Sequence, residues 1–422
     1  MIDQKPHIAV LSSLFPSSIQ PHAGLFVRER LFRVGERIPI TIIAPMPWFP
    51  FQSILRHWRP HFRPGAPRHE HQNGHDVWYP RFVSIPALFK HWDGLAMALA
   101  ALPRLYALRR ARRLDLIDAH FGYPEGYAAV KLGRWLGVPV TITLRGTESR
   151  HARDPKLAPL LKEALHGASH IFAVAEALKR VAVELGIPPD KIEVIGNGVD
   201  TQRFRPLDRQ ASRAQLDLPT DAPILISVGG LVERKGFHRV IAQLPTLIEH
   251  WPSLIYLIVG GPSAEGNNRP ELEALVAQLG IEAHVRFLGA VTPDQLAAPL
   301  SAADIFILAT RNEGWANVFL EAMACGLPVV TTDVGGNREV VSDPALGIVV
   351  PFDDPNALLK ALMQALETRW DRAAIRQYAE RNSWDERVER LCRAFDALFP
   401  SKNGANSERN SQRPNATLRN AR

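Results

Sequence analysis

The sequence predicts an α/β protein with two doubly wound parallel sheets. Two observations support this prediction. Short apolar runs recur along both halves of the chain, and most are followed by a segment whose apolar residues have helical spacing. A polar stretch at residues 207–222, which fits a linker, separates the two halves. A length of 422 residues leaves room for two or three domains with sizeable cores.

In the first half, strands and helices alternate from residue 7 to residue 195. We expect strands over residues 7–13, 38–44, 116–119, 139–144, 170–173 and 192–195. We expect helices over residues 25–37, 95–114 (interrupted by Pro103), 125–137 and 157–166, and a last helix that ends at Gly186. Residues 45–76 lack periodicity, and a loop of that length is usually functional or mobile. Because parallel strands end at one edge of a sheet, ligand-binding residues are expected at that edge.

The second alternation begins at Ile224. We expect strands over residues 224–228, 254–259, 285–288, 304–308, 327–331 and 347–350, and helices over residues 237–249, 293–301, 317–325, 356–366 and 384–399. The last helix carries its apolar residues on one stripe. The predicted organisation is therefore a first domain over 1–206, a second over 207–375, a C-terminal helical segment over 376–400 and a disordered basic tail over 401–422.

Composition and charge limit the compartment and the partners. Hydrophobic residues make up 46% of the chain and charged residues 22%, as in soluble globular proteins. With only Cys325 and Cys392, no disulfide framework is expected, and a reducing cytoplasm is the predicted location. No apolar run reaches the roughly 18 residues of a transmembrane helix, and no signal peptide is expected. Net charge is +11 over residues 1–206 and −8 over residues 207–400, so the two halves are expected to meet different partners.

Glu313 and Glu321 stand eight residues apart between two apolar runs. Glu313 follows a predicted strand, and Glu321 lies about one turn inside the helix that Gly326 ends. Asn317 is a candidate N-cap for that helix. The backbone N–H groups between the carboxylates form a potential anion site. The arrangement suits a ligand with hydroxyls at both ends and phosphates in the middle.

A second charged turn, Ser227–Gly236, follows the first strand of the second half. Gly229 and Gly230 let backbone approach a ligand, and Arg234 and Lys235 bring positive charge. The spacing is not that of a Walker loop. The turn is predicted to bind a diphosphate; the alternative is a solvated charged turn.

The run from Glu313 to Glu321, followed by Ala-Met-Ala-Cys-Gly-x-Pro-Val-Val, resembles the motif of family 4 retaining glycosyltransferases. The resemblance covers most of residues 7–395 and is densest over 227–340. It implies the GT-B fold, in which two Rossmann-like domains face a cleft and the C-terminal helix crosses back to the first domain. It also implies transfer of a hexose-type sugar from a nucleotide-diphosphate sugar, with retention of anomeric configuration and without a metal or other cofactor.

The resemblance assigns donor-binding roles in the second domain. Lys235 matches the Lys that holds the donor diphosphate, and Arg234 is expected to replace an Arg for which this chain has Gly230. Glu321 is expected to accept hydrogen bonds from both ribose hydroxyls, and Glu313 to face the transferred sugar. The other donor-side residues implied are Gly229, Leu288, Gly314, Trp315, Ala316 (where Gly is common), Asn317 and Val318, together with Gly24 from the glycine loop of the first domain.

In the first domain, His120 matches a strand-end His that lines the family's reaction centre, although a lone His after a strand is more often structural. Arg145 replaces a His that is frequent in the family. Arg145 and Glu148 are assigned to the acceptor side, with an anionic group as one candidate partner of Arg145.

Two features are predicted to concern surfaces and metals. Histidines 57, 61, 69, 71 and 75 lack the spacing of a closed metal site, so a loop that gains charge at low pH is expected instead. Residues 46–63 and 102–113 mix arginines with apolar and aromatic residues, the composition of an interfacial anchor. We expect peripheral contact with the inner face of an anionic membrane and no nucleic-acid partner; the alternative is a solvated charged face.

Together these observations predict a glycosyltransferase acting on a glycan or lipid-linked acceptor in bacterial cell-surface polysaccharide synthesis. Two other classes stay open at this point. One is a GT-B sugar-nucleotide epimerase, and the other is a non-catalytic module that binds sugar nucleotides. Labelled sugar nucleotides separate the three, because transfer gives a new glycoside, epimerisation a new nucleotide sugar and a binding module neither.

Overall fold

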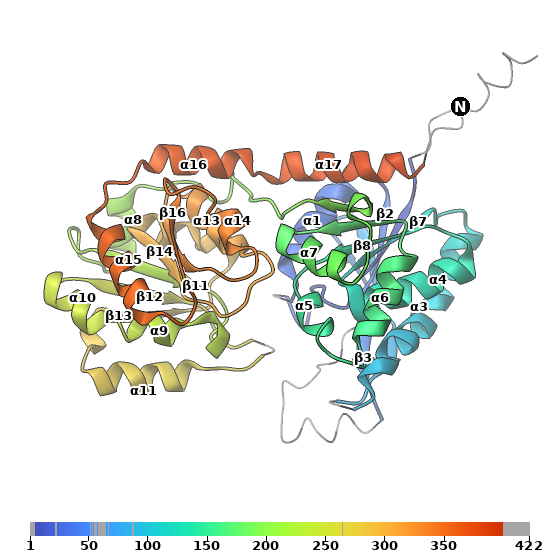
Figure 1. Ribbon diagram of the computed structural model, residues 1–422, viewed down its shortest axis with the longest axis horizontal. Helices are drawn as coiled ribbons and strands as arrows, with labels where there is room; N and C mark the ends of the chain where they lie inside the picture. Colours follow the sequence, from blue (N-terminus) through green and yellow to red (C-terminus); the bar gives the residue numbers. More distant parts are fainter. Residues whose placement is uncertain are drawn as a thin grey trace, which may run out of the picture.

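The computed structural model describes residues 5–399, except residues 22, 51, 53, 55, 56, 58–64, 66, 87 and 264. Two α/β domains lie side by side, and helices α16 (Arg372–Arg381) and α17 (Trp384–Ala397) run in line along one side of both (Figure 1). The predicted disordered tail at 401–422 lies outside the described residues.

The first domain is built on an eight-stranded sheet in the order β10-β9-β8-β7-β1-β2-β5-β4. Its strands are β1 (Ile8–Leu11), β2 (Ile40–Ile43), β4 (His69–Gln72), β5 (His75–Trp78), β7 (Leu116–His120), β8 (Val140–Leu144), β9 (His170–Ala173) and β10 (Ile192–Val194). Neighbouring strands are parallel, except that β4 pairs antiparallel with β5. The strand order reverses between β1 and β7, and such a switch point opens a ligand crevice at the carboxyl edge.

Helices cover both faces of this sheet. They are α1 (Leu25–Gly35), α3 (Asp93–Arg110), α4 (Tyr127–Leu136), α5 (Glu148–His151), α6 (Ala158–Gly167) and α7 (Glu176–Glu184). The prediction that Pro103 interrupts its helix is wrong, because α3 continues through it. The segment 45–76 contains β3 (Met46–Trp48), β4 and the start of β5, and β3 pairs with β6 (Arg81–Val83). The sequence His-Glu-His-Gln of β4 hid that strand, because a half-exposed edge strand needs no apolar run.

The second domain has six parallel strands in the order β13-β12-β11-β14-β15-β16. They are β11 (Ile224–Val228), β12 (Ile255–Val259), β13 (Val285–Gly289), β14 (Ile305–Leu308), β15 (Val329–Thr332) and β16 (Gly347–Val350). The remaining helices are α8 (Arg209–Gln215), α9 (Phe237–Ile241), α10 (Leu244–His250), α11 (Arg269–Leu279), α12 (Ala297–Ala302), α13 (Asn317–Ala324), α14 (Asn337–Val340) and α15 (Pro355–Glu367).

Two details of this domain differ from prediction. The expected linker at 207–222 contains α8, which is capped by Asp208 and held by ion pairs from Arg209 and Arg213 to Asp304. These polar contacts leave no apolar stripe to recognise in the sequence. The single helix predicted over 237–249 is two short helices, α9 and α10.

The crossing helix predicted for the C-terminus is confirmed. Val388, Leu391 and Phe395 of α17 are buried against the first domain, where Phe395 meets Phe172 edge-on with ring centroids 5.5 Å apart. By contrast, α16 contributes to the core of the second domain, so packing on the first domain begins at Trp384.

The chain passes between the two domains twice, and the two connecting segments lie side by side. The Val199 N–H donates to the Asn382 carbonyl over 3.1 Å, and the Trp384 N–H donates to the Val199 carbonyl over 3.2 Å. The segments therefore form a short parallel bridge between Val199 and Ser383.

Candidate active site between the domains

Lys235 and Glu313 form an ion pair at the carboxyl edge of the second sheet. Lys235 Nζ lies 2.5 Å from Glu313 Oε1, and the Thr310 hydroxyl donates to the same oxygen over 3.3 Å. The two charged side chains are only 15% and 10% exposed. Gly236 has φ of 77°, and a Cβ there would lie 1.9 Å from the Ala309 carbonyl oxygen. The turn therefore requires glycine, which holds Lys235 against the end of β14.

Arg234 lies beside this pair, but its main ion pair is with Glu265. Its guanidinium makes two contacts with Glu265, of 2.6 and 2.7 Å, and a longer one of 3.5 Å with Glu313. The hydrogen bonds to Glu265 raise the pKa of Arg234 above its ordinary value. Lys235 is thus the closer of the two predicted cations to Glu313.

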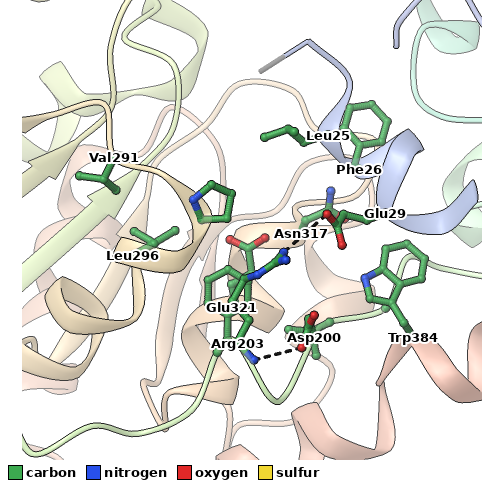
Figure 2. Close-up of a pocket in the computed structure, with 14 residues that line it drawn as sticks. Leu25, Phe26, Glu29, Asp200, Arg203, Val291, Leu296, Asn317, Glu321 and Trp384 are labelled. Atoms are coloured by element: carbon green, nitrogen blue, oxygen red, sulfur yellow. Dashed lines mark hydrogen bonds and ion pairs between the residues drawn. The ribbon is translucent and has the colours of Figure 1, made fainter. Parts of the chain in front are cut away.

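Glu321 lies in a cavity of about 280 Å³ between the domains (Figure 2). The lining residues are Leu25, Phe26, Glu29, Gly198, Val199, Asp200, Arg203, Phe204, Val291, Pro293, Leu296, Asn317, Glu321 and Trp384. Burial raises the pKa of Glu321 to about 7, and Arg203 opposes this rise. No hydrogen bond joins its carboxylate to the part of the chain that the structure describes, so both oxygens are free to accept from a ligand.

Arg203 spans the cavity from one domain to the other, with its guanidinium beside Glu321 in Figure 2. Its Nη1 lies 3.5 Å from Glu29 of α1, and its Nε lies 2.9 Å from Asp294 of the second domain. Neither Arg203 nor Glu29 was predicted from the sequence, because their partners are distant in sequence. The one sequence feature that could have indicated Arg203 was its positive charge in the segment that leaves the first domain.

Charged residues at the first-domain edge are buried and paired with one another. His120 is fully buried; its Nε2 lies 3.2 Å from Asp118 Oδ2, and Arg145 Nε donates to its Nδ1 over 3.1 Å. Burial, assisted by Arg145, lowers the pKa of His120 to about 3, so the imidazole is neutral. Arg145 also donates from Nη1 to Asn197 over 3.2 Å, whereas its buried Nη2 has no partner among the described residues. Sequence reasoning missed Asp118, which shares a strand face with His120.

Arg30 completes this buried cluster from α1. It donates to the Thr143 hydroxyl over 3.1 Å and lies over the Phe172 ring, 5.6 Å from its centroid. Burial lowers the pKa of Arg30 to about 10, while Asp118 opposes this fall. Arg30 and Arg145 thus both depend on the carboxylate of Asp118 for compensation.

Two carboxylates brace the loops at the same edge. Glu148 accepts from the backbone N–H groups of Gly122 (2.9 Å), Arg145 (3.1 Å) and Gly146 (2.7 Å). Glu125 accepts from the Ser13 backbone over 3.2 Å and from the Ser13 hydroxyl, and burial raises the pKa of Glu125 to about 7. The predicted acceptor-side role of Glu148 is untested, and here its side chain holds a loop.

The two edges touch at Gly314. A Cβ on Gly314 would lie 2.2 Å from the Arg145 carbonyl oxygen, so any larger residue would separate the domains here. The Trp315 ring lies against Gly196, which lies two residues beyond the end of β10 in the first domain. The prediction that Asn317 caps α13 is wrong, because Asn317 is the first helical residue. Its side-chain oxygen instead accepts from Asn197 Nδ2 over 2.8 Å.

The other predicted donor-side residues surround these groups. Gly24 precedes α1 with φ of 68°, where a Cβ would lie 2.4 Å from the Leu14 carbonyl oxygen. The rest are Gly229 and Gly230 after β11, Leu288 in β13, and Ala316 and Val318 at the start of α13. Gly229 lies against the stem of Lys235. The structure thus gathers Gly229, Arg234, Lys235 and Glu313 in one group and Asn317 and Glu321 in another.

Neither a metal cluster nor a membrane span is found in the described ranges. No group of three or more His, Cys, Asp or Glu residues there could hold a metal ion. No helix there is long and apolar enough to cross a bilayer. Of the histidines in the 57–75 segment, His69 and His71 contact Asp76 at 3.0 and 3.5 Å, and His61 lies outside the described residues.

Known proteins match both halves of the chain. Residues 32–203 match the family described as Glycosyltransferase Family 4, and residues 208–382 match Glycosyl transferases group 1. The D-inositol 3-phosphate glycosyltransferase of Corynebacterium urealyticum is 32% identical over 67% of this chain and 72% of that protein. The corresponding protein of Geodermatophilus obscurus is 34% identical over 71% of this chain and 70% of its own length.

Solved structures share the two-domain architecture. Sucrose-phosphate synthase from Thermosynechococcus elongatus has a TM-score of 0.72 at 22% identity, covering 94% of this chain and all of that one. HepE of Anabaena in complex with UDP has a TM-score of 0.69 at 19% identity, covering 93% of this chain and all of that one. At this level of identity the likeness concerns the fold, which is GT-B.

Proposed function

Because the chain belongs to glycosyltransferase family 4, we propose that it moves a sugar from a nucleotide-diphosphate sugar to a hydroxyl of a glycan or lipid-linked acceptor. The observation that carries this proposal is the pairing of Lys235 with Glu313 just before α13, the helix whose Glu321 lines the cavity between the domains with no hydrogen-bond partner among the described residues. The carboxyl edge of the second sheet and the helix that follows β14 thus supply a cation for phosphates and an acceptor for ribose hydroxyls.

Lys235 is the group proposed to bind the donor diphosphate. Its ammonium is shielded from solvent, so its attraction for an anion is screened less than that of an exposed lysine. Arg234 is the second candidate, and it must exchange Glu265 for the phosphate. As the bond from the sugar to the diphosphate breaks, negative charge grows on the phosphate oxygen, and a fixed cation there stabilises the transition state.

Glu321 is proposed to bind the ribose. Its ionised carboxylate accepts from two hydroxyls at once. We further propose that the acceptor oxygen attacks the anomeric carbon from the face that the diphosphate leaves, which retains the configuration. The acceptor proton then passes to the departing phosphate oxygen, so atoms and charge balance without a protein nucleophile or a metal.

Arg145 is the residue proposed to select the acceptor. Its Nη2 is buried without a partner among the described residues, and an unmade bond of that kind is unfavourable until a ligand supplies an acceptor. An anionic acceptor group fits this donor. Cell-surface polysaccharide synthesis at the cytoplasmic face of a membrane is the proposed setting. A phosphorylated polyol is the second candidate acceptor, favoured by the names of the curated relatives and by Arg145.

Radiolabelled UDP- and GDP-sugars, incubated with glycan, lipid-linked and inositol phosphate acceptors, test the proposal. We expect a new glycoside with the donor's anomeric configuration, formed equally with and without EDTA. A new nucleotide sugar would identify an epimerase, and binding without turnover would identify a binding module. Full loss of activity in EDTA with recovery in Mn²⁺ would contradict the metal-independent reaction while leaving transfer in place.

A further inference from the structure

Most of the exposed large apolar side chains among the described residues lie on or next to β3, β6 and α3 of the first domain. The exposed large apolar residues there are Trp48, Val83, Ile85, Leu88, Phe89, Trp92, Leu99 and Tyr106. Trp48 lies opposite Val83 in the two-stranded sheet, and α3 packs against β6. These residues therefore lie on neighbouring elements, and exposed apolar side chains gathered in this way are typical of an interaction site.

Helix α3 has two apolar faces, of which only one is used by the core. Its inner face is buried and includes Met97, Ala101, Leu105 and Leu108. Its outer face carries Leu99 and Tyr106, 56% and 54% exposed, one and two heptads after Trp92 at 57%. Phe89 is 62% exposed, and we call Phe89, Trp92, Leu99 and Tyr106 the α3 stripe.

The α3 stripe corrects the sequence-based choice of an anchor. That choice included Leu105 and Leu108, which lie in the first-domain core. Part of the other proposed segment, including Arg56 and Trp58, lies outside the described residues. The exposed residues were missed because the inner and outer faces of α3 are both apolar, which hides the helical period.

The charge around the α3 stripe has one sign. Residues 81–113 contain seven Lys or Arg but a single acidic residue, Asp93. That carboxylate already lies 3.0 Å from Lys90 Nζ. Arg110, Arg112 and Arg113 are exposed at the far end of the helix. A second copy of this face would bring like charges together, whereas an anionic lipid surface complements both the charge and the aromatic side chains.

Phe89 and Trp92 lie at the end of the α3 stripe that is nearer the carboxyl edge of the first sheet. This edge, where the acceptor is proposed to bind, is called the acceptor edge. The Tyr123 hydroxyl donates to the Lys90 carbonyl over 2.6 Å and accepts from the Gly94 N–H over 3.3 Å. Tyr123 is three residues beyond His120, the end of β7. The start of α3 is thus bonded to the loop at the switch point, and the arginines lie at the other end of the helix.

We propose that the α3 stripe docks on an anionic lipid bilayer, with Phe89 and Trp92 inserted near the acceptor edge and the arginines on the headgroups. Delivery of a lipid-linked acceptor to that edge rests on the proposed function, but the docking itself does not. Each Lys or Arg near an anionic surface strengthens binding about fivefold, and salt screens this contribution.

Flotation with vesicles tests the docking. The wild-type protein is expected to float with vesicles of equal parts phosphatidylcholine and phosphatidylglycerol, and much less with phosphatidylcholine alone. The triple variant Phe89→Ser, Trp92→Ser, Leu99→Ser should bind about tenfold or more weakly. Trp135→Ser is the matched control, since Trp135 is 47% exposed on α4, and it should bind like wild type. Equal flotation of the triple variant and wild type would overturn the proposal.

Two further measurements distinguish insertion into lipid from self-association of the protein and from a loss of catalysis. Lipids brominated on their acyl chains should quench the fluorescence of wild-type protein, and Trp92→Phe should lose a larger part of that quenching than Trp135→Phe. Quenching unchanged by Trp92→Phe, or a stripe variant that alters oligomeric state and not flotation, would contradict the proposal. Turnover on a soluble acceptor should be equal in wild type and the triple variant; its absence in both would refute the proposed transfer and leave flotation to decide docking.

Discussion

The carboxyl edges of the two sheets use charge in opposite ways. At the second-domain edge, Lys235 and Glu313 pair in a shielded turn, and Glu321 faces a cavity with its carboxylate unpartnered among the described residues. At the first-domain edge, Asp118, His120 and Arg145 lie in the interior and bond to one another. The segments that follow parallel strands therefore supply ligand-facing groups in the second domain. In the first domain the strand ends and the residues just after them form a buried scaffold, in which Arg145 Nη2 keeps a donor without a partner among the described residues.

This difference teaches that a charged residue after a strand does not by itself indicate contact with a ligand. A buried charge without compensation is expensive, so the members of a buried cluster must satisfy one another first. A group that faces a cavity keeps bonding capacity for a ligand. Substitutions at the two edges should accordingly change different quantities: stability at the first, and catalysis or binding at the second.

The largest expected effect is on stability, at the first-domain edge. Asp118→Asn would leave Arg30 and Arg145 buried without their shared countercharge, which should reduce the free energy of unfolding by about 3–5 kcal/mol. Asp76→Asn is the matched control, because Asp76 pairs with His69 at the surface and exposed pairs are worth about 0–1 kcal/mol. Urea denaturation measures both. Equal losses in the two variants would remove the contrast between the edges.

At the second-domain edge, Lys235→Ala should reduce kcat by about 10²–10³, equivalent to about 2–4 kcal/mol of transition-state stabilisation. Arg311→Ala, which removes an exposed arginine paired with Glu233, should leave kcat within a factor of about two. Steady-state kinetics with circular dichroism as a folding check decides the matter. A folded Lys235→Ala enzyme with near wild-type kcat would exclude the diphosphate role.

Glu321→Ala and Glu313→Ala should separate binding from chemistry. Loss of the ribose contacts of Glu321, made equally before and in the transition state, should raise KM for the donor about 10–100-fold with little change in kcat. Glu313→Ala should lower kcat more than it raises KM, since Glu313 is proposed to face the transferred sugar. The reverse pattern in initial-rate measurements would mean that the two roles are exchanged.

The smallest effect concerns pH and compares two carboxyls whose pKa values both rise to about 7. Only the ionised form of Glu321 accepts two hydroxyl hydrogen bonds, so nucleotide binding should be about tenfold weaker at pH ~6 than at pH ~8. Glu321→Gln should remove this dependence, and Glu125→Gln should keep it, because Glu125 accepts from Ser13 and does not line the cavity. Calorimetric titration with the nucleotide would show whether the curves differ in this way.

The same two carboxyls affect stability with a defined sign. Their folded pKa values lie above the ordinary value of 4.5. The stability that each contributes is therefore fully present below pH 4.5 and is lost as pH rises through about 7. The stability difference between wild type and Glu125→Gln should shift against wild type over that window, and a difference that does not vary with pH would argue against a raised pKa for Glu125.

The sequence predicted the two sheets because their strands are buried on both faces and form continuous apolar runs, as in Ile305–Leu308. It also located Lys235, which lies in a short turn after β11, and Glu313 and Glu321, which are only eight residues apart, one just before α13 and one within it. It could not locate Arg203, because the cavity takes Glu29 from one domain and Asp294 from the other. Nor could it show that His120 is buried, because its burial depends on Arg145, which follows the neighbouring strand β8.

The paired crossings at Val199 and Ser383 have a mechanical consequence. Two adjacent connections allow the domains to bend about one line but resist twisting or sliding past each other. They also connect the domains twice, so that one connection remains if the other is cut. A chain cut once by a protease near residue 207 should remain a noncovalent pair of fragments, because α17 belongs to the second fragment by sequence and to the first by its buried apolar face. Gel filtration of such a nicked protein should show one peak at the mass of the intact chain.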